Sequence, residues 1–204
     1  MSADEIVFYY NPMSRAQIVN WMLEEVGAPR RTIVLDFEKG EHKTPAFLAV
    51  NPMGKLPTIV HRGVVVTETA AIVAYLADAF PEAGLAPATD DPLRGAYYRW
   101  LFFGAGCFEP AITDRMFDRP AVARKGALGY GSYEDVLGAL KQALDPGPYL
   151  LGERFTAADV YVGAQISWAM MFGAPSLKGE PAFDRYVARL NERPALRRAN
   201  GAGG

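Results

Sequence analysis

The feature that most constrains the fold is an abrupt change of sequence pattern near residue 80. Before it, short β-rich segments alternate with helix-like segments, and after it strand-like segments nearly vanish. Strand–helix alternation needs crossover connections and predicts a parallel strand pair, whereas long amphipathic segments predict a helical bundle. We therefore expect an α+β domain over residues 1–80, a linker over 81–91 and an all-α helical bundle domain over 92–204.

The first domain is expected to follow the order β-α-β-α-β-β-α. Arg62-Gly63 favours a tight hairpin between the last two strands, and His61 is expected to face solvent. Thr44 and Pro45 suit the cap and the first position of the middle helix. The predicted strands cover residues 6–10, 32–35, 57–61 and 64–67, and the predicted helices cover 16–26, 44–50 and 69–79.

The second domain is expected to contain helices only. The segment from Thr156 to Asp159 is typical of a capping box at a helix start. The uncharged stretch 160–177 is interrupted by glycine and proline, which favours a buried core helix over the alternative of a membrane span. The predicted helices are 93–116 with Pro110 as a candidate kink, 133–144, one starting near 156, 182–191 and a short one after Pro194.

Charge and cysteine content narrow the function classes. The formal net charge is −2, which gives no electrostatic reason to expect nucleic acid or a membrane surface as a partner. The single cysteine, Cys107, allows no internal disulfide, and the acidic N-terminus does not look like a secretory signal. We expect a cytoplasmic protein.

Two segments carry the features of a ligand site. The prolines and glycine of residues 51–57 direct the chain into a strand, and a cis Leu56–Pro57 bond would leave the Leu56 backbone open to pair with a peptide. Glu68 and Thr69 lie where a strand turns into a helix. Helix N-terminal amides attract a carboxylate and Glu68 attracts an ammonium, so a ligand end with both groups fits there.

These segments resemble a known family. Residues 51–57, followed by Thr67 to Leu76, resemble the glutathione-binding core of the glutathione transferase superfamily. Residues 40–45 are similar to plant phi-type and many bacterial members, and residues 155–159 resemble the capping signature of the helical domain. The resemblance covers essentially the whole chain. It implies a thioredoxin-like N-terminal domain, an all-α C-terminal domain, glutathione as co-substrate, no metal and a homodimer.

The resemblance also implies roles for individual residues. Leu56 would pair its backbone with the cysteinyl unit of glutathione, Pro57 would be the cis-proline, and Glu68 and Thr69 would hold the γ-glutamyl end. The candidates for the glycyl carboxylate are His42, Lys43 and Lys55. Lys43 is favoured because its ammonium is charged without any pKa shift, although each of the three also fits a solvated surface residue.

Ser14 is the candidate for activating the thiol. A free thiol has a pKa of about 8.5, and lowering it by two units requires about 2.7 kcal/mol of preferential stabilisation of the anion. A hydroxyl donor at the start of a helix would contribute to that stabilisation, although Ser14 also fits a plain helix cap. The family's usual serine and cysteine positions fall nearer the neighbours of Ser14, so Asn11, Tyr10 and Arg15 remain alternatives.

The acceptor pocket is assigned to a region of the helical domain. An apolar electrophile needs an apolar wall, and the first helix of the bundle is rich in aromatic residues. The candidates are Tyr97, Trp100, Phe103, Cys107 and Phe108, with no chemical role for the thiol of Cys107.

The sequence therefore predicts a glutathione transferase. The expected reaction conjugates glutathione to a small apolar electrophile, as in detoxification, with peroxide reduction as a further activity. The alternatives are a specialised glutathione-dependent dehalogenase or isomerase, and a non-catalytic ligand-binding or regulatory protein. No cysteine lies in the loop around Ser14, and no Cys-x-x-Cys is present, so dithiol exchange is excluded.

Overall fold

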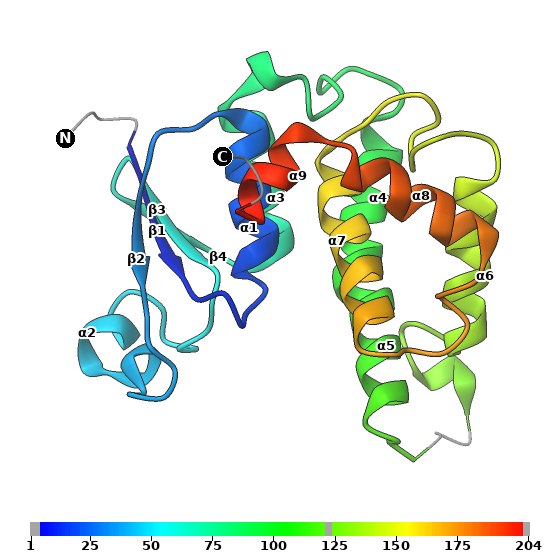
Figure 1. The fold of residues 1–204 in the computed structure, drawn as a ribbon, viewed down its shortest axis with the longest axis horizontal. Coiled ribbons are helices and arrows are strands. Elements are labelled where there is room, and N and C mark those ends of the chain that lie inside the picture. Colours follow the sequence, from blue (N-terminus) through cyan, green and yellow to red (C-terminus); the bar gives the residue numbers. More distant parts are fainter. Residues whose placement is uncertain (1–4, 121–123, 202–204) are drawn as a thin grey trace. The chain divides into compact units, whose positions relative to one another are not determined.

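The computed structural model describes residues 5–120 and 124–201 and divides the chain into two compact units (Figure 1). The first unit extends to Gly84 and takes in the final helix from Pro194, and the second unit covers Leu85–Arg193. The first is built on a mixed sheet and the second on helices, as the change of pattern near residue 80 predicts.

The sheet of the first unit has the strand order β2-β1-β3-β4. β1 (Ile6–Tyr10) pairs in parallel with β2 (Arg30–Val34), and antiparallel with β3 (Thr58–His61). β4 (Val64–Thr67) pairs antiparallel with β3 through a turn in which Arg62 and Gly63 both have positive φ. The predicted parallel pair and the predicted hairpin are both confirmed.

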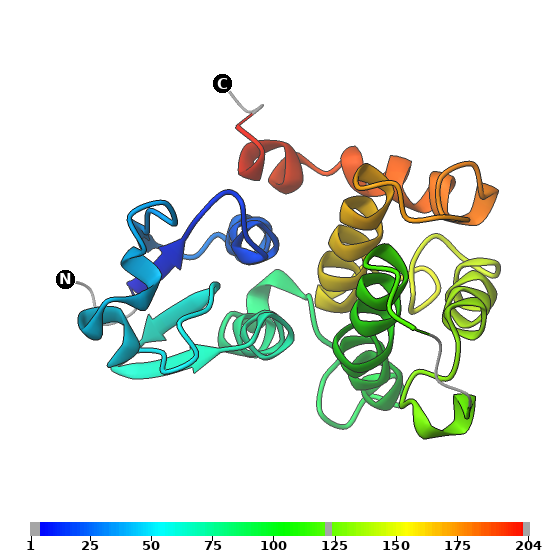
Figure 2. The same cartoon turned by 90° about the horizontal axis from the view of Figure 1, so that it is seen from below.

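Helices cover the two faces of this sheet unequally. α1 (Ala16–Val26) and α3 (Thr69–Ala79) lie side by side on one face, while the short α2 (Pro45–Leu48) lies toward the other, as Figure 2 shows from below. The fully buried Phe8 and Ile59 are register partners on β1 and β3, and Tyr9 turns the opposite way to contact Phe47 of α2. Alternate side chains of β1 therefore point to opposite faces of the sheet, one covered by α1 and α3 and the other contacted by α2.

The last helix, α9 (Pro194–Ala199), belongs to the first unit. It packs on α1, where the Asn20 side chain donates to the Ala199 carbonyl at 3.0 Å and Arg198 pairs with Glu24 at 2.8 Å. The sequence-based boundary placed this helix in the domain 92–204. The sequence of α9 does not indicate which unit the helix packs on, because the bonds that hold it join positions more than 170 residues apart.

The prediction that His61 faces solvent is wrong. Its side chain is 1% exposed, its Nδ1 lies 2.8 Å from the Tyr75 hydroxyl of α3, and its ring stacks on Phe80. His61 shares the helix-covered face of β3 with Ile59, since the two are two residues apart on one strand. The strand pattern alone does not reveal this burial, because it depends on α3, which covers this end of the strand.

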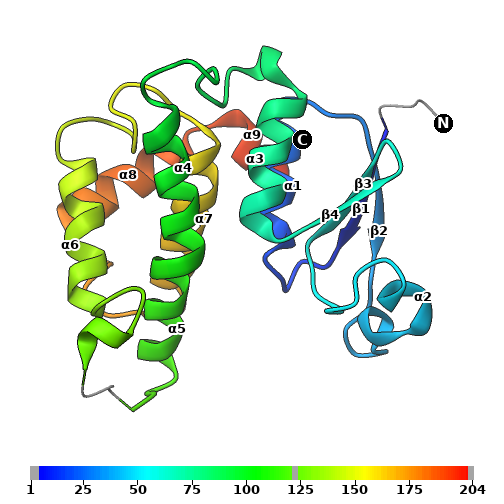
Figure 3. The same cartoon turned by 180° about the vertical axis from the view of Figure 1, so that it is seen from behind.

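The second unit is a bundle of helices (Figure 3). The predicted helix 93–116 is present, but π-helical backbone at Gly104–Phe108 separates α4 (Arg94–Phe103) from α5 (Glu109–Met116). The interruption precedes Pro110, which cannot donate a hydrogen bond to the preceding turn. The remaining long helices are α6 (Tyr133–Leu144), α7 (Ala157–Met171) and α8 (Pro181–Asn191), and α4 packs on α7.

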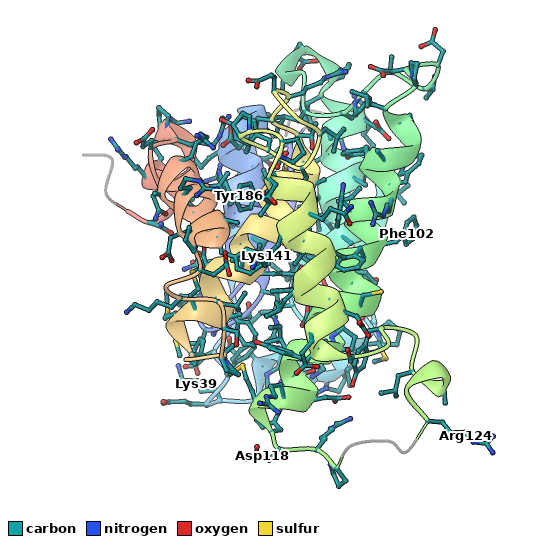
Figure 4. All side chains as sticks on the ribbon, turned by 90° about the vertical axis from the view of Figure 1, so that its right-hand side faces the viewer. Lys39, Phe102, Asp118, Arg124, Lys141 and Tyr186 are labelled. Atoms are coloured by element: carbon teal, nitrogen blue, oxygen red, sulfur yellow. The ribbon has the colours of Figure 1, made fainter. Side chains whose placement is uncertain are left out.

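α7 is the buried helix that its uncharged sequence predicts. Most of its residues are buried, and none of the helices among residues 5–120 and 124–201 combines the length and the hydropathy of a membrane span. At its start, the Asp159 carboxylate accepts from the Thr156 amide at 2.8 Å and from the Leu150 amide at 2.9 Å. The Tyr186 hydroxyl of α8 donates to the same carboxylate at 2.9 Å, and Figure 4 labels that side chain within the helical unit.

Asp159 should make stability depend on pH. Burial raises the pKa of this carboxyl from 3.8 to about 6, so between these values the native state holds a proton that the unfolded state has lost. The unfolding free energy should therefore fall as the pH rises through this window, by roughly 3 kcal/mol from this group. Relative to wild type, Asp159→Asn should gain stability between pH 4 and pH 7 in urea titrations. If the difference in unfolding free energy between Asp159→Asn and wild type did not change between pH 4 and pH 7, the raised pKa of Asp159 would be contradicted.

Candidate functional site

Three adjacent strands bring the predicted site segments to one end of the sheet. Tyr9 of β1 pairs with Thr58 of β3, and Thr58 pairs with Thr67 of β4. The chain therefore leaves β1 toward Ser14, enters β3 from Pro57 and leaves β4 toward Glu68 at the same end. Two strand spacings are about 10 Å, which is close to the extended length of a tripeptide.

The middle of this row is an unused backbone edge. The Leu56–Pro57 peptide bond is cis, and strand pairing with β1 and β4 begins only at Thr58. Within the described part of the chain, neither the N–H nor the C=O of Leu56 has a hydrogen-bond partner. A ligand with a peptide backbone can therefore pair with Leu56 as an added strand.

The loop before Leu56 is held by Asn51 and Gly54. The Asn51 side chain, 2% exposed, donates to the Lys55 carbonyl at 2.9 Å and to the Thr58 hydroxyl at 3.0 Å. Gly54 has φ +57°, and a Cβ there would lie 2.7 Å from the His42 carbonyl oxygen. The loop 51–57 is thus packed directly against the 3₁₀ turn η1 (Glu41–Lys43).

Glu68 and Thr69 form one end of the row. Glu68 is exposed and has φ 65°, which is uncommon for a residue with a side chain and costs about 1–2 kcal/mol. It precedes α3, whose first amides have no side-chain cap. An exposed carboxylate beside open helix N-terminal amides can hold an ammonium and a carboxylate on the same ligand.

The three candidate cations differ in their surroundings. Lys43 is exposed, and its ammonium donates to the Met53 carbonyl at 3.0 Å, so it already joins η1 to the loop 51–57. The His42 ring is half-buried and contacts Phe37 edge-on with centroids 4.7 Å apart. Lys55 is exposed one residue before Leu56. The structure brings all three candidate side chains to the segments that surround the Leu56 edge.

Ser14 begins α1 at the other end of the row. Its hydroxyl donates to the Asn11 carbonyl at 2.7 Å and accepts from the Ala16 amide at 3.1 Å. The bond from the Ala16 amide means that Ser14 also acts as a cap at the start of the helix. The side chain is half-buried at the N-terminus of an 11-residue helix, where the helix dipole favours a nearby anion.

The alternative donors of this loop also bond neighbouring protein groups. The Tyr10 hydroxyl donates to the Gln17 side chain at 2.7 Å, and burial raises the pKa of this phenol. The Asn11 amide donates to the Leu35 carbonyl at 2.8 Å while its oxygen accepts from the Met13 amide. Arg15 directly precedes α1, with a backbone φ of −60° and ψ of −6°. Ser14 is the hydroxyl of this group that lies directly at the helix N-terminus.

The candidate acceptor residues are not equally accessible. Tyr97, Trp100 and Phe108 are at most 3% exposed, whereas Phe103 and Cys107 are half-buried. The three buried rings therefore act first as core of the helical unit. A hollow of about 210 Å³ in this unit lies between the end of α6 and α8, and none of the predicted site residues lines it.

The chemistry of the row follows from its parts. The Leu56 backbone edge lies in the middle of the row. On one side is the start of α1, which favours an anion and carries the Ser14 hydroxyl. On the other side are the Glu68 carboxylate and the first amides of α3, which together fit a zwitterion. Such a row can bind a short peptide that carries a zwitterionic end and a group that becomes anionic. Within residues 5–120 and 124–201, no group of His, Cys, Asp and Glu side chains is arranged to hold a metal ion.

Comparisons with known proteins identify the family. The model of the glutathione S-transferase N-terminal domain matches residues 5–78, and that of the C-terminal domain matches residues 110–198. The chain is 30% identical over 155 residues to glutathione S-transferase GST-4.5 of Xanthomonas campestris pv. campestris, covering 72% of this chain and 75% of that protein. This chain belongs to the glutathione transferase family.

Two further relatives bear on function within the family. The maleylacetoacetate isomerase of Pseudomonas aeruginosa is 29% identical over 171 residues, which cover 80% of this chain and 79% of that protein. A glutathione transferase family member from Pseudomonas fluorescens pf-5, crystallised with two glutathione bound, has a TM-score of 0.81 and 27% identity. The match covers 98% of this chain and 93% of that one.

Sequence reasoning missed three contacts that hold the segments of the candidate site. It gave Asn51 no role of its own, although that buried side chain holds the loop before Leu56. It also missed the bond between Lys43 and the Met53 carbonyl, and the one between Tyr10 and Gln17. The repeated Asn-Pro-Met sequence at 11–13 and 51–53 was the available signal for Asn51.

Gly54 should be more sensitive to substitution than other glycines with positive φ. Gly54→Ala forces a Cβ against the His42 carbonyl and the Lys43 ammonium, at 2.7 and 2.8 Å. We expect a loss of about 3 kcal/mol in the unfolding free energy. Gly27→Ala is the matched control, because φ there is +65° with open space around it, and should cost about 1 kcal/mol. Equal losses in urea titrations would contradict the packing of this loop.

Proposed function

We propose that this protein is an enzyme that binds glutathione, lowers the pKa of its thiol and adds the thiolate to a small apolar electrophile. The observation that carries the proposal is the unpaired Leu56 backbone beside a cis-proline, at the same sheet end as Ser14 and Glu68. The membership of the glutathione transferase family supports glutathione as the ligand.

Each part of glutathione has a partner in this arrangement. The cysteinyl unit pairs with the Leu56 N–H and C=O, and the γ-glutamyl carboxylate and ammonium take the α3 amides at Thr69 and the Glu68 carboxylate. The glycyl carboxylate takes Lys43, with His42 and Lys55 as further candidates. Lys43 keeps two ammonium protons for a ligand after its bond to Met53.

Ser14 is the proposed thiol-activating residue. The Oγ proton now bonds the Asn11 carbonyl at 2.7 Å, and a thiolate is a stronger acceptor because it is charged. Rotation about the Ser14 side chain redirects that proton to the sulfur while the α1 N-terminus supplies further stabilisation. The proposed acceptor residues all belong to the helical unit. Phe103 and Cys107 are the accessible candidates, and Tyr97, Trp100 and Phe108 are buried beneath them in its core.

An isomerase is the second candidate function. The similarity to the maleylacetoacetate isomerase of Pseudomonas aeruginosa favours it. The same bound thiolate would add to a conjugated double bond, allow rotation about the resulting single bond and then leave. Activity assays should therefore include activated alkenes as well as aryl halides, epoxides and peroxides. The proposal also includes a homodimer and a reducing cytoplasmic setting, in which the glutathione thiol stays available.

Removal of the Glu68 charge should weaken glutathione binding selectively. In Glu68→Gln the ammonium of the ligand loses its counter-charge, so the dissociation constant measured by calorimetry should rise about tenfold. Glu82→Gln is the matched control, since Glu82 is also exposed but lies in the short turn after α3. An equal affinity of Glu68→Gln and wild type would remove the γ-glutamyl assignment.

Removal of the Ser14 hydroxyl should slow the chemistry more than it weakens binding. Ser14→Ala should lower kcat with chlorodinitrobenzene about 10–100-fold, the effect of one charge-assisted hydrogen bond, and change glutathione affinity less than about threefold. The control is Ser167→Ala, whose hydroxyl bonds a carbonyl within α7. Full turnover by Ser14→Ala would assign activation to another donor, and tight glutathione binding by wild type without turnover would favour a binding protein.

A further inference from the structure

Two turns of the same sequence flank the candidate site. Residues 11–13 and residues 51–53 both read Asn-Pro-Met, and we call them the first and second Asn-Pro-Met turns. The first follows β1, and the second leads through Leu56 into β3. Because β1 and β3 are antiparallel neighbours, both turns lie at the same end of the sheet.

The two turns share one backbone geometry. In the first, the Asn11 side-chain oxygen accepts from the Met13 amide at 2.8 Å, and in the second Asn51 accepts from the Met53 amide at 3.1 Å. The backbone carbonyls of Asn11 and Asn51 also accept from the amides three residues on, at 3.2 and 2.8 Å. Both methionines point outward and are 83% and 64% exposed.

Each asparagine also ties its turn to the framework. Asn11 is 8% exposed and donates to the Leu35 carbonyl, just after β2, at 2.8 Å. Asn51 is 2% exposed and donates to the Lys55 carbonyl and the Thr58 hydroxyl, at 2.9 and 3.0 Å. A buried carboxamide bonded at both ends holds a turn rigidly, because breaking one bond leaves an unsatisfied buried group.

The two turns present different halves of the site. The Asn11 carbonyl receives the Ser14 hydroxyl at 2.7 Å, so the first turn sets the position of the proposed thiol-activating group. The Asn51 amide fixes the carbonyl of Lys55, so the second turn sets the direction in which the chain presents Leu56. Both side-chain N–H groups of Asn51 bond the protein, whereas Asn11 uses one of its two for the Leu35 carbonyl.

We propose that Asn11 and Asn51 are paired positioning residues with separable effects, Asn11 on thiol activation and Asn51 on glutathione affinity. The inference rests on the proposed function of the Leu56 edge and Ser14. It assigns Asn11 to the support of Ser14 rather than to direct contact with the sulfur. Each asparagine thus acts through the residue that its turn presents.

The test compares Asn11→Ala with Asn51→Ala in the full chain. The glutathione dissociation constant is measured by calorimetry, and the pKa of the bound thiol by the ultraviolet absorbance of its thiolate against pH. The kcat with chlorodinitrobenzene is recorded as a third readout. Each variant serves as the control for the other, because both lose a buried carboxamide from the same turn sequence.

The expected results separate along these readouts. Asn11→Ala should raise the pKa of the bound thiol by about one unit and lower kcat about tenfold, with glutathione affinity changed less than about threefold. Asn51→Ala should weaken glutathione binding about tenfold, with little change in the pKa of the thiol that does bind. A purely structural role would lower the thermal midpoint without this division.

Milder variants keep the test decisive if an alanine variant does not fold. A serine at either position retains an acceptor for the amide two residues on but cannot reach the Leu35 or Lys55 carbonyl. Asn11→Ser and Asn51→Ser should show the same division with smaller effects. Equal changes of both readouts in both variants, or no change in either, would overturn the inference.

Failure of the proposed function can be distinguished from failure of the roles proposed for Asn11 and Asn51. A wild-type protein that binds glutathione but turns over no electrophile contradicts the transferase proposal. The calorimetry and the thiolate titration still decide the roles of Asn11 and Asn51 in that case. A wild-type protein that binds no glutathione contradicts both, whereas an active wild type with undivided variant effects contradicts only the pairing.

Discussion

Hydrogen bonding between β1, β3 and β4 brings three separate chain segments to one end of the sheet. Tyr9, Thr58 and Thr67 are register partners, so the segments that continue from them emerge as neighbours. The Leu56 edge, the α1 start and the α3 start depend on this register. A slip by one residue would turn the buried face of a strand toward solvent, so the same apolar contacts that fold the unit also align the site.

The local bonds then decide what each segment can do. Leu56 keeps a free backbone because pairing begins at Thr58, and Glu68 stays in a strained conformation beside open helix amides. Tyr10, Asn11 and Ser14 all bond neighbouring protein groups, and among them Ser14 is the hydroxyl that lies at the start of α1. The proposed binding groups and the proposed activating group thus come from different elements of one sheet.

The sequence predicted those features that local patterns determine. The strand–helix order, the Arg62-Gly63 hairpin and the capping of α7 by Asp159 follow from residues close together in the chain. The family motif predicted Pro57 as the cis-proline, and the structure has that bond. The candidate site segments around Leu56 and Glu68 could be recognised from the sequence for the same reason, because each is a short contiguous motif.

Features that depend on distant contacts could not be predicted. The burial of His61 under Tyr75 and the docking of α9 on α1 both arise from packing between elements. The Lys43–Met53 bond likewise joins two loops. The most direct test of the account is a crystal structure with glutathione. It should show the cysteinyl backbone paired with Leu56 and the sulfur within about 3.5 Å of the Ser14 hydroxyl. Glutathione bound elsewhere, with Leu56 unpaired, would contradict it.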